Sequence, residues 1–401
     1  MAIEVQAEPR PGDSSSADWT DLVHTGPDTL AGRYLRRFWQ PVDVSQKLEP
    51  GRAKPIRIMS EDFTLYRGET GEAHLVAFRC AHRGTQLSTG WVEGDDLRCF
   101  YHGWKYSADG QCIEQPAEPE PFWNRIRIRS YPTQEYLGLI FVYFGEGAEP
   151  PRESTSGRTT GDGQIQPPEF PRYPVFDEFK GVRLTSCLGI WPCNFFNQID
   201  NDPIHPSFVH RQHGAKPPMH VESREAEYGM DNDTHHPDGD VSGGYKYMPN
   251  IMHYSAYPLP GTTERWQGLS WRVPVDDEHT ISFNVRVIPA FGEVAKRYES
   301  GGWGEGSTAQ DGVEAALQVL RGERPQTDLE TLPAGIALQA QDYVAQIGQG
   351  AIPNTSAWHL GREDSTVTLF RQLWQRELRA LAEGRPLTQW KNAGQALARG
   401  E

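Results

Sequence analysis

The stretch "CAHRGTQLSTGWVEGDDLRCFYHGW", which runs from Cys80 to Trp104, contains two similar cysteine–histidine pairs. Cys80 and His82 stand two positions apart, and after sixteen intervening residues Cys99 and His102 stand three positions apart. The chain has only 5 cysteines in 401 residues, too few and too scattered for a disulfide scaffold. Thiolates and neutral imidazoles are metal ligands. The stretch therefore predicts a metal centre whose ligands are Cys80, His82, Cys99 and His102.

The mixed composition of the pairs indicates which kind of metal centre this is. Zinc fingers typically pair cysteine with cysteine and histidine with histidine. In mixed pairs, each turn can give one thiolate to one iron and one imidazole to another, which is the arrangement of a Rieske [2Fe–2S] cluster. Gly84 follows the first pair, and Gly103 and Trp104 follow the second. The pattern favours a Rieske cluster, with zinc as the alternative.

A second constellation lies in "NFFNQIDNDPIHPSFVHRQH", where Asp202, His205 and His210 have the spacing D-x2-H-x4-H. Two histidines and a carboxylate with open positions form the facial triad of non-haem Fe(II) sites. Histidines five positions apart lie about 140° apart round a regular helix. A shared metal therefore requires an irregular helix, which Pro206 would produce. A simple helix cap, with Pro203 at the first position, is the alternative for Asp202.

The run "CAHRG…CFYHGW" resembles the Rieske domain of the Rieske non-haem iron oxygenases, the ring-hydroxylating oxygenases. The similarity includes "TGPDTLAGRYLRRFWQPV" upstream and continues through most of the chain, and it is greatest to the phthalate and phenoxybenzoate dioxygenase types. Rieske proteins of respiratory complexes carry an extra cysteine near each pair, whereas Thr85 and Tyr101 stand near those places here. The resemblance implies an inner iron held by the two cysteines and an outer iron held by the two histidines.

The resemblance also implies roles for the second constellation. His205 and His210 would hold a mononuclear Fe(II), and the third ligand would be a downstream aspartate, for which "GIALQAQDYVAQIGQG" offers Asp342. Asp202 would then be no ligand. It would bond His205 and also the Rieske residue His102 of a neighbouring subunit, and so link the two metal centres.

Several other residues have more than one possible role. Asp200 is the alternative to Asp202, although its spacing to His205 fits the motif less well. Arg211 directly follows an iron ligand and could bind a substrate carboxylate or form a surface salt bridge. His235 and His236 lie in a polar loop and are interpreted as solvated surface. The remaining thiols are expected to be plain buried cysteines: Cys112, Cys187 and Cys193.

The pattern of the chain predicts an α+β protein. Residues 1–45 form an N-terminal segment with a short helix that ends before Pro41, and 46–150 form an all-β Rieske domain. A Pro-, Gly-, Ser- and Thr-rich stretch from 145 to 174 marks the boundary. Residues 151–401 form the catalytic domain, for which the resemblance implies a helix-grip fold, an antiparallel sheet around a long helix. Within it, "LSWRVPVDDEHTISFNVRVIP" predicts a hairpin and "DSTVTLFRQLWQRELRALAEG" an amphipathic helix.

Charge and composition exclude several classes of protein. A formal net charge of -15 argues against binding to nucleic acid or to an anionic membrane surface. No stretch approaches the length of an apolar membrane span, and the N-terminus has no signal-peptide pattern. We therefore expect a cytoplasmic protein.

The resemblance implies the terminal component of an oxygenase system that hydroxylates a small aromatic substrate, carboxylated or not. Electrons would come from NAD(P)H through a separate reductase, with or without a ferredoxin, because the chain has no nucleotide-binding fingerprint. The assembly would be a homotrimer or a hexamer. An O- or N-demethylating monooxygenase is the main alternative, and a Rieske electron carrier or a zinc-stabilised binding module is more distant.

Overall fold

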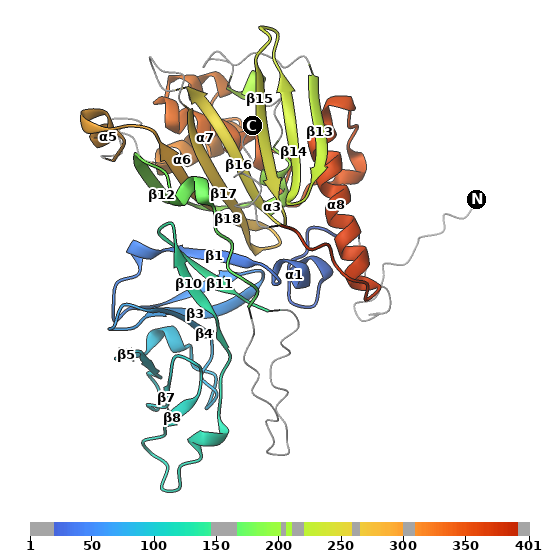
Figure 1. Cartoon of the computed structure of the whole chain (residues 1–401). Helices are drawn as coiled ribbons and strands as arrows, with labels where there is room; N and C mark the ends of the chain where they lie inside the picture. The colour runs from blue at the N-terminus through green and yellow to red at the C-terminus, as the bar shows by residue number, and fades with distance from the viewer. Residues whose placement is uncertain are drawn as a thin grey trace.

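The computed structural model describes residues 20–145, 167–201, 206–210, 220–258, 265–299 and 309–391. Figure 1 shows two stacked parts: a mainly β part with one short helix, and a part that combines one large sheet with most of the helices. The predicted α+β class is therefore confirmed.

The N-terminal part consists of a short helix and short strands in small antiparallel sheets. Its elements are α1 (Leu30–Leu35), β1 (Trp39–Val44), β2 (Ala53–Ile58), β3 (Glu61–Arg67), β4 (Ala73–Ala77), β5 (Trp91–Glu93), β6 (Asp96–Arg98), β7 (Lys105–Tyr106), β8 (Cys112–Glu114), β9 (Ser130–Tyr131), β10 (Thr133–Tyr136) and β11 (Leu139–Tyr143). The strand orders are β1-β11-β10, β2-β3-β4-β9 and β5-β6-β7-β8.

The helix α1 is shorter than the sequence predicts. It is capped at its start by Thr29, whose hydroxyl oxygen accepts a hydrogen bond from the N–H of Gly32. It ends at Leu35 rather than just before Pro41, because β1 starts at Trp39 and pairs with β11. The segment expected to precede the β domain thus supplies one of its strands.

The C-terminal part is built on a seven-stranded antiparallel sheet with the order β12-β18-β17-β16-β15-β14-β13. Its elements are α2 (Pro174–Asp177), β12 (Val182–Trp191), α3 (Phe195–Ile199), α4 (Pro206–Val209), β13 (His220–Ala226), β14 (Gly229–His235), β15 (Val241–Tyr247), β16 (Ile251–Pro258), β17 (Arg265–Asp276), β18 (His279–Ile288), α5 (Gly292–Glu299), α6 (Ala309–Leu320), α7 (Ala334–Ile347) and α8 (Ser365–Ala382). The predicted hairpin is β17–β18, and the predicted amphipathic helix is α8.

The two faces of the large sheet have different neighbours. One face carries Trp271 and Phe283, both fully buried, and the ring of Trp271 packs against Phe141 of β11 at 5.5 Å. The other face is covered by helices, since α8 packs against β13 and β14 and α3 packs against β17. The sheet therefore lies between the Rieske part and the helices.

Backbone hydrogen bonds also join the two parts. The N–H of Met59 donates to the carbonyl of Pro274 at 2.8 Å, and that of Ser60 donates to Val275 at 2.9 Å. One hydrophobic cluster includes side chains from α1, β1, β11, the large sheet and α8. The boundary expected at residue 150 lies outside the described residues. In the part of the chain that the structure describes, no helix is both long and apolar enough to cross a membrane.

Candidate metal centres

The first cysteine–histidine pair lies on a tight turn after β4. The N–H of Cys80 donates to the carbonyl of Thr85 at 2.8 Å, and the N–H of Gly84 donates back to the carbonyl of Cys80 at 2.9 Å. These two bonds close the turn around its first residue.

The second turn, between β6 and β7, repeats this arrangement. The N–H of Cys99 donates to the carbonyl of Trp104 at 2.8 Å, and the N–H of Gly103 donates to the carbonyl of Cys99 at 3.1 Å. The φ angles of Gly84 and Gly103 are 75° and 74°. Both turns thus need a residue in the left-handed backbone conformation, which glycine adopts at the lowest energetic cost. This explains why a glycine follows each pair.

The four predicted ligands lie on these two turns. Cys80 and Cys99 are 3% and 1% exposed, whereas the two histidines are half-buried. The rings of His82 and His102 lie 4.6 Å apart, and the indole of Trp104 stacks on His82 at 4.6 Å with an interplanar angle of 7°. The thiols are therefore inside and the imidazoles outside, as the resemblance implies.

The donor atoms fit a Rieske cluster. Nδ1 of His82 is buried without a hydrogen-bond partner among the described residues. Burial raises the pKa of the Cys80 thiol, and the neighbouring Cys99 raises it further. Desolvation lowers the pKa of His102, which favours the neutral imidazole that binds metal. A buried nitrogen without a hydrogen-bond partner is unfavourable, and a bound metal would satisfy the lone pair of His82 Nδ1.

The positions of the four ligands also bear on whether the site holds zinc or a [2Fe–2S] cluster. Within the described ranges, no three His, Cys, Asp or Glu side chains surround a single metal position. A structural zinc ion requires four ligands around one point, whereas a [2Fe–2S] cluster takes two protein ligands at each of two irons. Here the two thiols adjoin each other and the two imidazole rings lie 4.6 Å apart, which is the grouping that a binuclear cluster requires.

The second constellation is described in part. Asp202 and His205 lie outside the described residues. His210, just after α4, and Asp342, on α7, are 132 residues apart in sequence. Nε2 of His210 nevertheless lies 3.1 Å from Oδ1 of Asp342. The structure thus brings together two of the predicted iron ligands.

Gln341, which the sequence did not single out, sets the orientation of the His210 ring. Its amide oxygen lies 3.0 Å from Nδ1 of His210, and both side chains are buried. That oxygen can only accept, so Nδ1 carries a proton, and a neutral ring would present the lone pair of Nε2 to a metal. Nε2 and the carboxylate of Asp342 then face each other as two acceptors, an arrangement that a shared cation stabilises.

Comparison with known proteins identifies the family. Residues 38–132 match the Rieske [2Fe-2S] domain. The chain is 28% identical, over 92% of its length and 82% of the relative's, to the oxygenase subunit of 5,5'-dehydrodivanillate O-demethylase from a Sphingobium species. It is 27% identical, over 89% and 83%, to the alpha subunit of phenoxybenzoate dioxygenase from Ectopseudomonas oleovorans. The chain belongs to the Rieske-type oxygenases.

A solved structure supports the same fold. The oxygenase in the oxygenase–ferredoxin complex of carbazole 1,9a-dioxygenase superposes with a TM-score of 0.59 at 18% identity. The match covers 92% of this chain and 95% of that chain. The predicted pairing of an N-terminal Rieske domain with a C-terminal antiparallel-sheet domain is confirmed. The cofactors of this Rieske-type oxygenase are a [2Fe–2S] cluster and a mononuclear non-haem iron.

Asp200, the alternative to Asp202, forms an ion pair in this oxygenase. Nε and Nη2 of Arg371 donate to its Oδ2 at 3.0 and 2.5 Å. The guanidinium lies 4.8 Å from the ring centres of both Phe196 and Trp358. Asp200 therefore connects the end of α3 to α8.

Other residues named from the sequence have ordinary surroundings or are not described. Arg211 lies outside the described residues. His235 is the last residue of β14 rather than part of a loop, and Nε2 of His236 lies 2.9 Å from the hydroxyl of Ser242. Cys112 and Cys193 are buried free thiols, and burial raises the pKa of each to about 11. Cys187 is a free thiol that is only partly buried.

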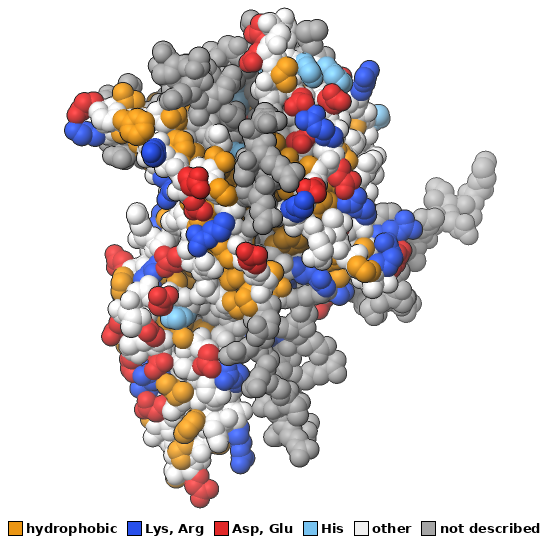
Figure 2. Space-filling model, in the orientation of Figure 1, with side chains coloured by type: hydrophobic (Ala, Val, Ile, Leu, Met, Phe, Trp, Pro, Cys, Tyr) orange, Lys and Arg blue, Asp and Glu red, His pale blue; other side chains and the backbone are white. Residues whose placement is uncertain are grey.

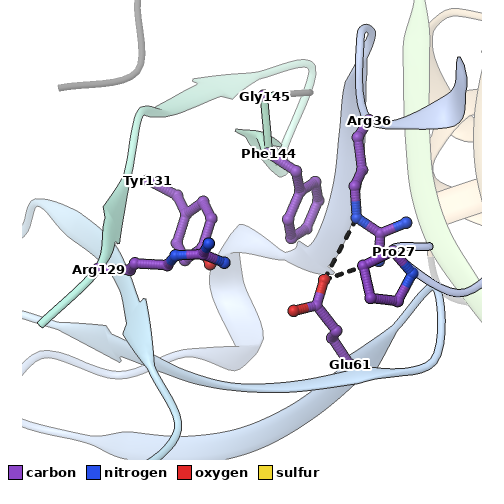
Figure 3. Close-up of a pocket in the computed structure, with 7 residues that line it drawn as sticks. All are labelled: Pro27, Arg36, Glu61, Arg129, Tyr131, Phe144 and Gly145. Atoms are coloured by element: carbon purple, nitrogen blue, oxygen red, sulfur yellow. Dashed lines mark hydrogen bonds and ion pairs between the residues drawn. The ribbon is translucent and has the colours of Figure 1, made fainter. Parts of the chain in front are cut away.

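A pocket between α1 and the small sheets contains none of the predicted metal ligands (Figure 3). Nη2 of Arg36 donates to the carboxylate of Glu61 at 2.7 Å and to the carbonyl of Met59 at 2.8 Å, and Nη1 donates to the carbonyls of Thr25 and Gly32. The guanidinium is thus occupied by protein acceptors. We assign this pocket a structural role. Its lining residues are Pro27, Arg36, Glu61, Arg129, Tyr131, Phe144 and Gly145.

Proposed function

We propose that this chain is the terminal oxygenase that hydroxylates a small aromatic substrate, using O2 and electrons derived from NAD(P)H. The observation that carries the proposal is the approach of His210 Nε2 to Asp342 Oδ1 at 3.1 Å. A protein that only carries electrons needs the Rieske cluster alone, whereas an oxygenase also needs a metal centre with open positions for O2 and substrate.

Each metal centre has a proposed set of ligands. Those of the cluster are Cys80, His82, Cys99 and His102, and those of the iron are His205, His210 and Asp342. When bound, the cluster supplies single electrons and the mononuclear iron activates O2. The Tyr106 hydroxyl lies 3.2 Å from both the sulfur of Cys80 and the N–H of Ala81, so it fixes the first turn. Asp202 would accept hydrogen bonds from His205 and from His102 of a neighbouring subunit.

The proposed substrate is an aromatic carboxylate. Dehydrodivanillate and phenoxybenzoate, named for two relatives, both carry a carboxylate on an aromatic ring. Arg211 follows a proposed iron ligand directly and is one candidate to bind that group.

O-demethylation is the second candidate reaction. It is favoured by the 28% identity to an O-demethylase subunit over 92% of this chain. Hydroxylation of a methoxy carbon and hydroxylation of a ring carbon place the substrate differently beside the same iron. The two outcomes therefore depend on the shape of the substrate site rather than on the metal ligands.

The proposed assembly is a homotrimer or hexamer in the cytoplasm, reduced by an NAD(P)H-dependent reductase with or without a ferredoxin. Trp91, Phe100 and Tyr101 are 51%, 59% and 55% exposed, and Tyr101 adjoins His102. Apolar side chains are also visible at the end of the Rieske part in Figure 2. Such a surface beside the outer ligands suits docking against a neighbouring subunit.

The experiment uses purified protein, a surrogate reductase, NADH and 18O2, with a panel of benzoates, phthalates and methoxylated aromatic acids. Two labelled oxygen atoms in one product would identify a dioxygenase. One labelled atom on the ring would identify a ring monooxygenase, whereas an unlabelled phenol released with formaldehyde, which carries the oxygen atom away, would identify the demethylase. No hydroxylated or demethylated product, from protein that holds both metal centres, would contradict the proposal.

A further inference from the structure

The helix-covered face of the large sheet carries a cluster of polar side chains. In the β17–β18 register, Ser270 lies opposite Asn284 and Arg272 lies opposite Ser282. Directly paired residues and residues two apart on one strand share a face. Trp271 therefore points to the opposite face, towards the Rieske part. The four polar residues form a compact patch, and three of them are buried: Ser270, Ser282 and Asn284.

This patch packs against α3, and Arg272 lies within electrostatic range of Asp342. The hydroxyl of Ser282 donates to Oε1 of Gln198, on α3, at 2.6 Å. The guanidinium of Arg272 lies close enough to Asp342, on α7, for the carboxylate to stabilise its charge. No ion pair joins Arg272 to Asp342 in the described part of the chain. Arg272 thus lies near the proposed iron site without forming an ion pair with its proposed ligand Asp342.

Two buried donors on this patch have no acceptor. Asn284 is 2% exposed, and its Oδ1 accepts from the hydroxyl of Ser270 at 2.6 Å. That bond directs Nδ2 away from Ser270, and Nδ2 has no hydrogen-bond partner among the described residues. Nε of Arg272 is buried and equally without a partner. A folded protein rarely leaves two neighbouring buried donors unsatisfied, so ordered water or a bound ligand supplies the acceptor, and a ligand oxygen would replace that water in the bound state.

The chemistry of the missing acceptor follows from the donors. One is a guanidinium, which binds carboxylates through paired N–H groups, and the other is a neutral amide N–H. The guanidinium is largely removed from solvent, and its Nε donor has no acceptor among the described residues. An anionic group with two oxygens satisfies both donors, whereas a neutral amide or ester satisfies them only in part.

We propose that Arg272 and Asn284 form the subsite that binds the carboxylate of the substrate and so orients its ring beside His210 and Asp342. This proposal rests on the proposed function, since it assigns the substrate class of the same site. The residues that select a carboxylated substrate would then lie on strands β17 and β18, and Arg211 would not be one of them.

The test measures binding without turnover. The fully metallated enzyme is titrated anaerobically by calorimetry with benzoate, 3-phenoxybenzoate and vanillate, and with the matching primary amides. We expect at least one acid to bind about tenfold or more tightly than its amide, and Arg272→Met to remove that preference by weakening the acid much more than the amide. Asn284→Asp places a fixed carboxylate beside Arg272 and should also weaken acid binding, which keeps the test decisive if Arg272→Met does not fold.

The matched controls are two arginine variants. Arg183→Met removes an arginine of β12 that donates to the carbonyl of Phe176, and it should leave the acid preference intact. Arg211→Met tests whether Arg211, the other candidate, binds the substrate carboxylate instead. Loss of the preference in Arg211→Met but not in Arg272→Met would overturn the proposal, as would equal affinity of the wild-type enzyme for acid and amide, or no binding of any acid.

The outcomes also separate this proposal from the proposed function. Selective acid binding without any hydroxylated or demethylated product would support the subsite and contradict the oxygenase activity. Incorporation of 18O into neutral aromatics, with no preference for acids, would support the activity and contradict the subsite.

Discussion

At the scale of single residues, the contacts of Gln341 decide which nitrogen of His210 can bind a metal. The amide oxygen of Gln341 lies 3.0 Å from Nδ1 of His210, which directs Nε2 to Asp342. Partners of this kind fix the tautomer and the ring plane of a ligand before the metal arrives. Gln341 is therefore a positioning residue for the mononuclear site.

Gln341→Leu should weaken Fe(II) binding by about 10- to 100-fold, because the His210 ring loses its acceptor. Gln341→Glu keeps an acceptor and should retain most of the affinity. The measurement is an anaerobic metal titration of protein that retains its cluster, with Gln349→Leu, beyond the end of α7, as the control. Equal affinity of Gln341→Leu and the wild type would contradict this role.

A buried histidine away from the metal centres predicts a pH dependence of stability. Nδ1 of His253 lies 2.7 Å from the Tyr247 hydroxyl and Nε2 lies 3.2 Å from Oε1 of Gln267, so the ring is neutral. Burial lowers the pKa of His253 to about 4, below its unfolded value of about 6.5. The unfolded chain binds the proton more readily, and stability should therefore fall as the pH drops from about 6.5 towards 4.

At pH 5 this single histidine accounts for about 2 kcal/mol of lost unfolding free energy relative to pH 7. Urea denaturation of the wild type and of His253→Gln at both pH values measures the effect. The variant should lose less stability between pH 7 and pH 5 than the wild type does, and an equal loss in both proteins would contradict the assignment.

At the scale of elements, the Rieske site depends on two turns with the same hydrogen bonds, each with a glycine of positive φ. Gly84→Ala should cost about 1 kcal/mol of stability and lower the cluster content, because the strain falls on a ligand turn. Gly94→Ala, in the β5–β6 turn at φ 64°, is the matched control, since an added Cβ meets nothing within 4 Å at either position. Gly94→Ala should lose similar stability and keep its labile sulfide. Full sulfide content in Gly84→Ala would contradict this account of the turn.

Local patterns in the sequence predict the elements better than the site. Alternation predicts the β17–β18 hairpin, and an apolar stripe predicts α8, because each element satisfies its own backbone and buries one face. The end of α1 was misplaced because the pairing of β1 with β11, a long-range contact, decides it. The approach of His210 to Asp342 was expected only from the family resemblance, since no spacing rule reaches across 132 residues. Gln341 and Arg272 had no local signal.

At the scale of the whole molecule, the two metal centres would cooperate across subunits. His102 lies between β6 and β7 of the N-terminal part, and Asp342 lies on α7 of the other part (Figure 1). The proposed link therefore joins His102 of one subunit to Asp202 of the next.

Complementation tests this link. Cys99→Ser should lack the cluster and Asp342→Ala should lack the mononuclear iron, so each homo-oligomer should be inactive. Hetero-oligomers purified through two different tags should regain a measurable fraction of wild-type turnover, because an intact cluster then faces an intact iron across an interface. Mixed assemblies as inactive as either parent would show that electrons pass within one subunit.

One chain should hold both a Rieske cluster and a separate iron, and a metal and sulfide analysis of the purified protein measures both. We expect about three irons and two labile sulfides per chain. Asp342→Ala should fall to about two irons with unchanged sulfide and an unchanged cluster spectrum. Zinc without sulfide in the wild type, or the same iron content in Asp342→Ala and the wild type, would contradict this expectation.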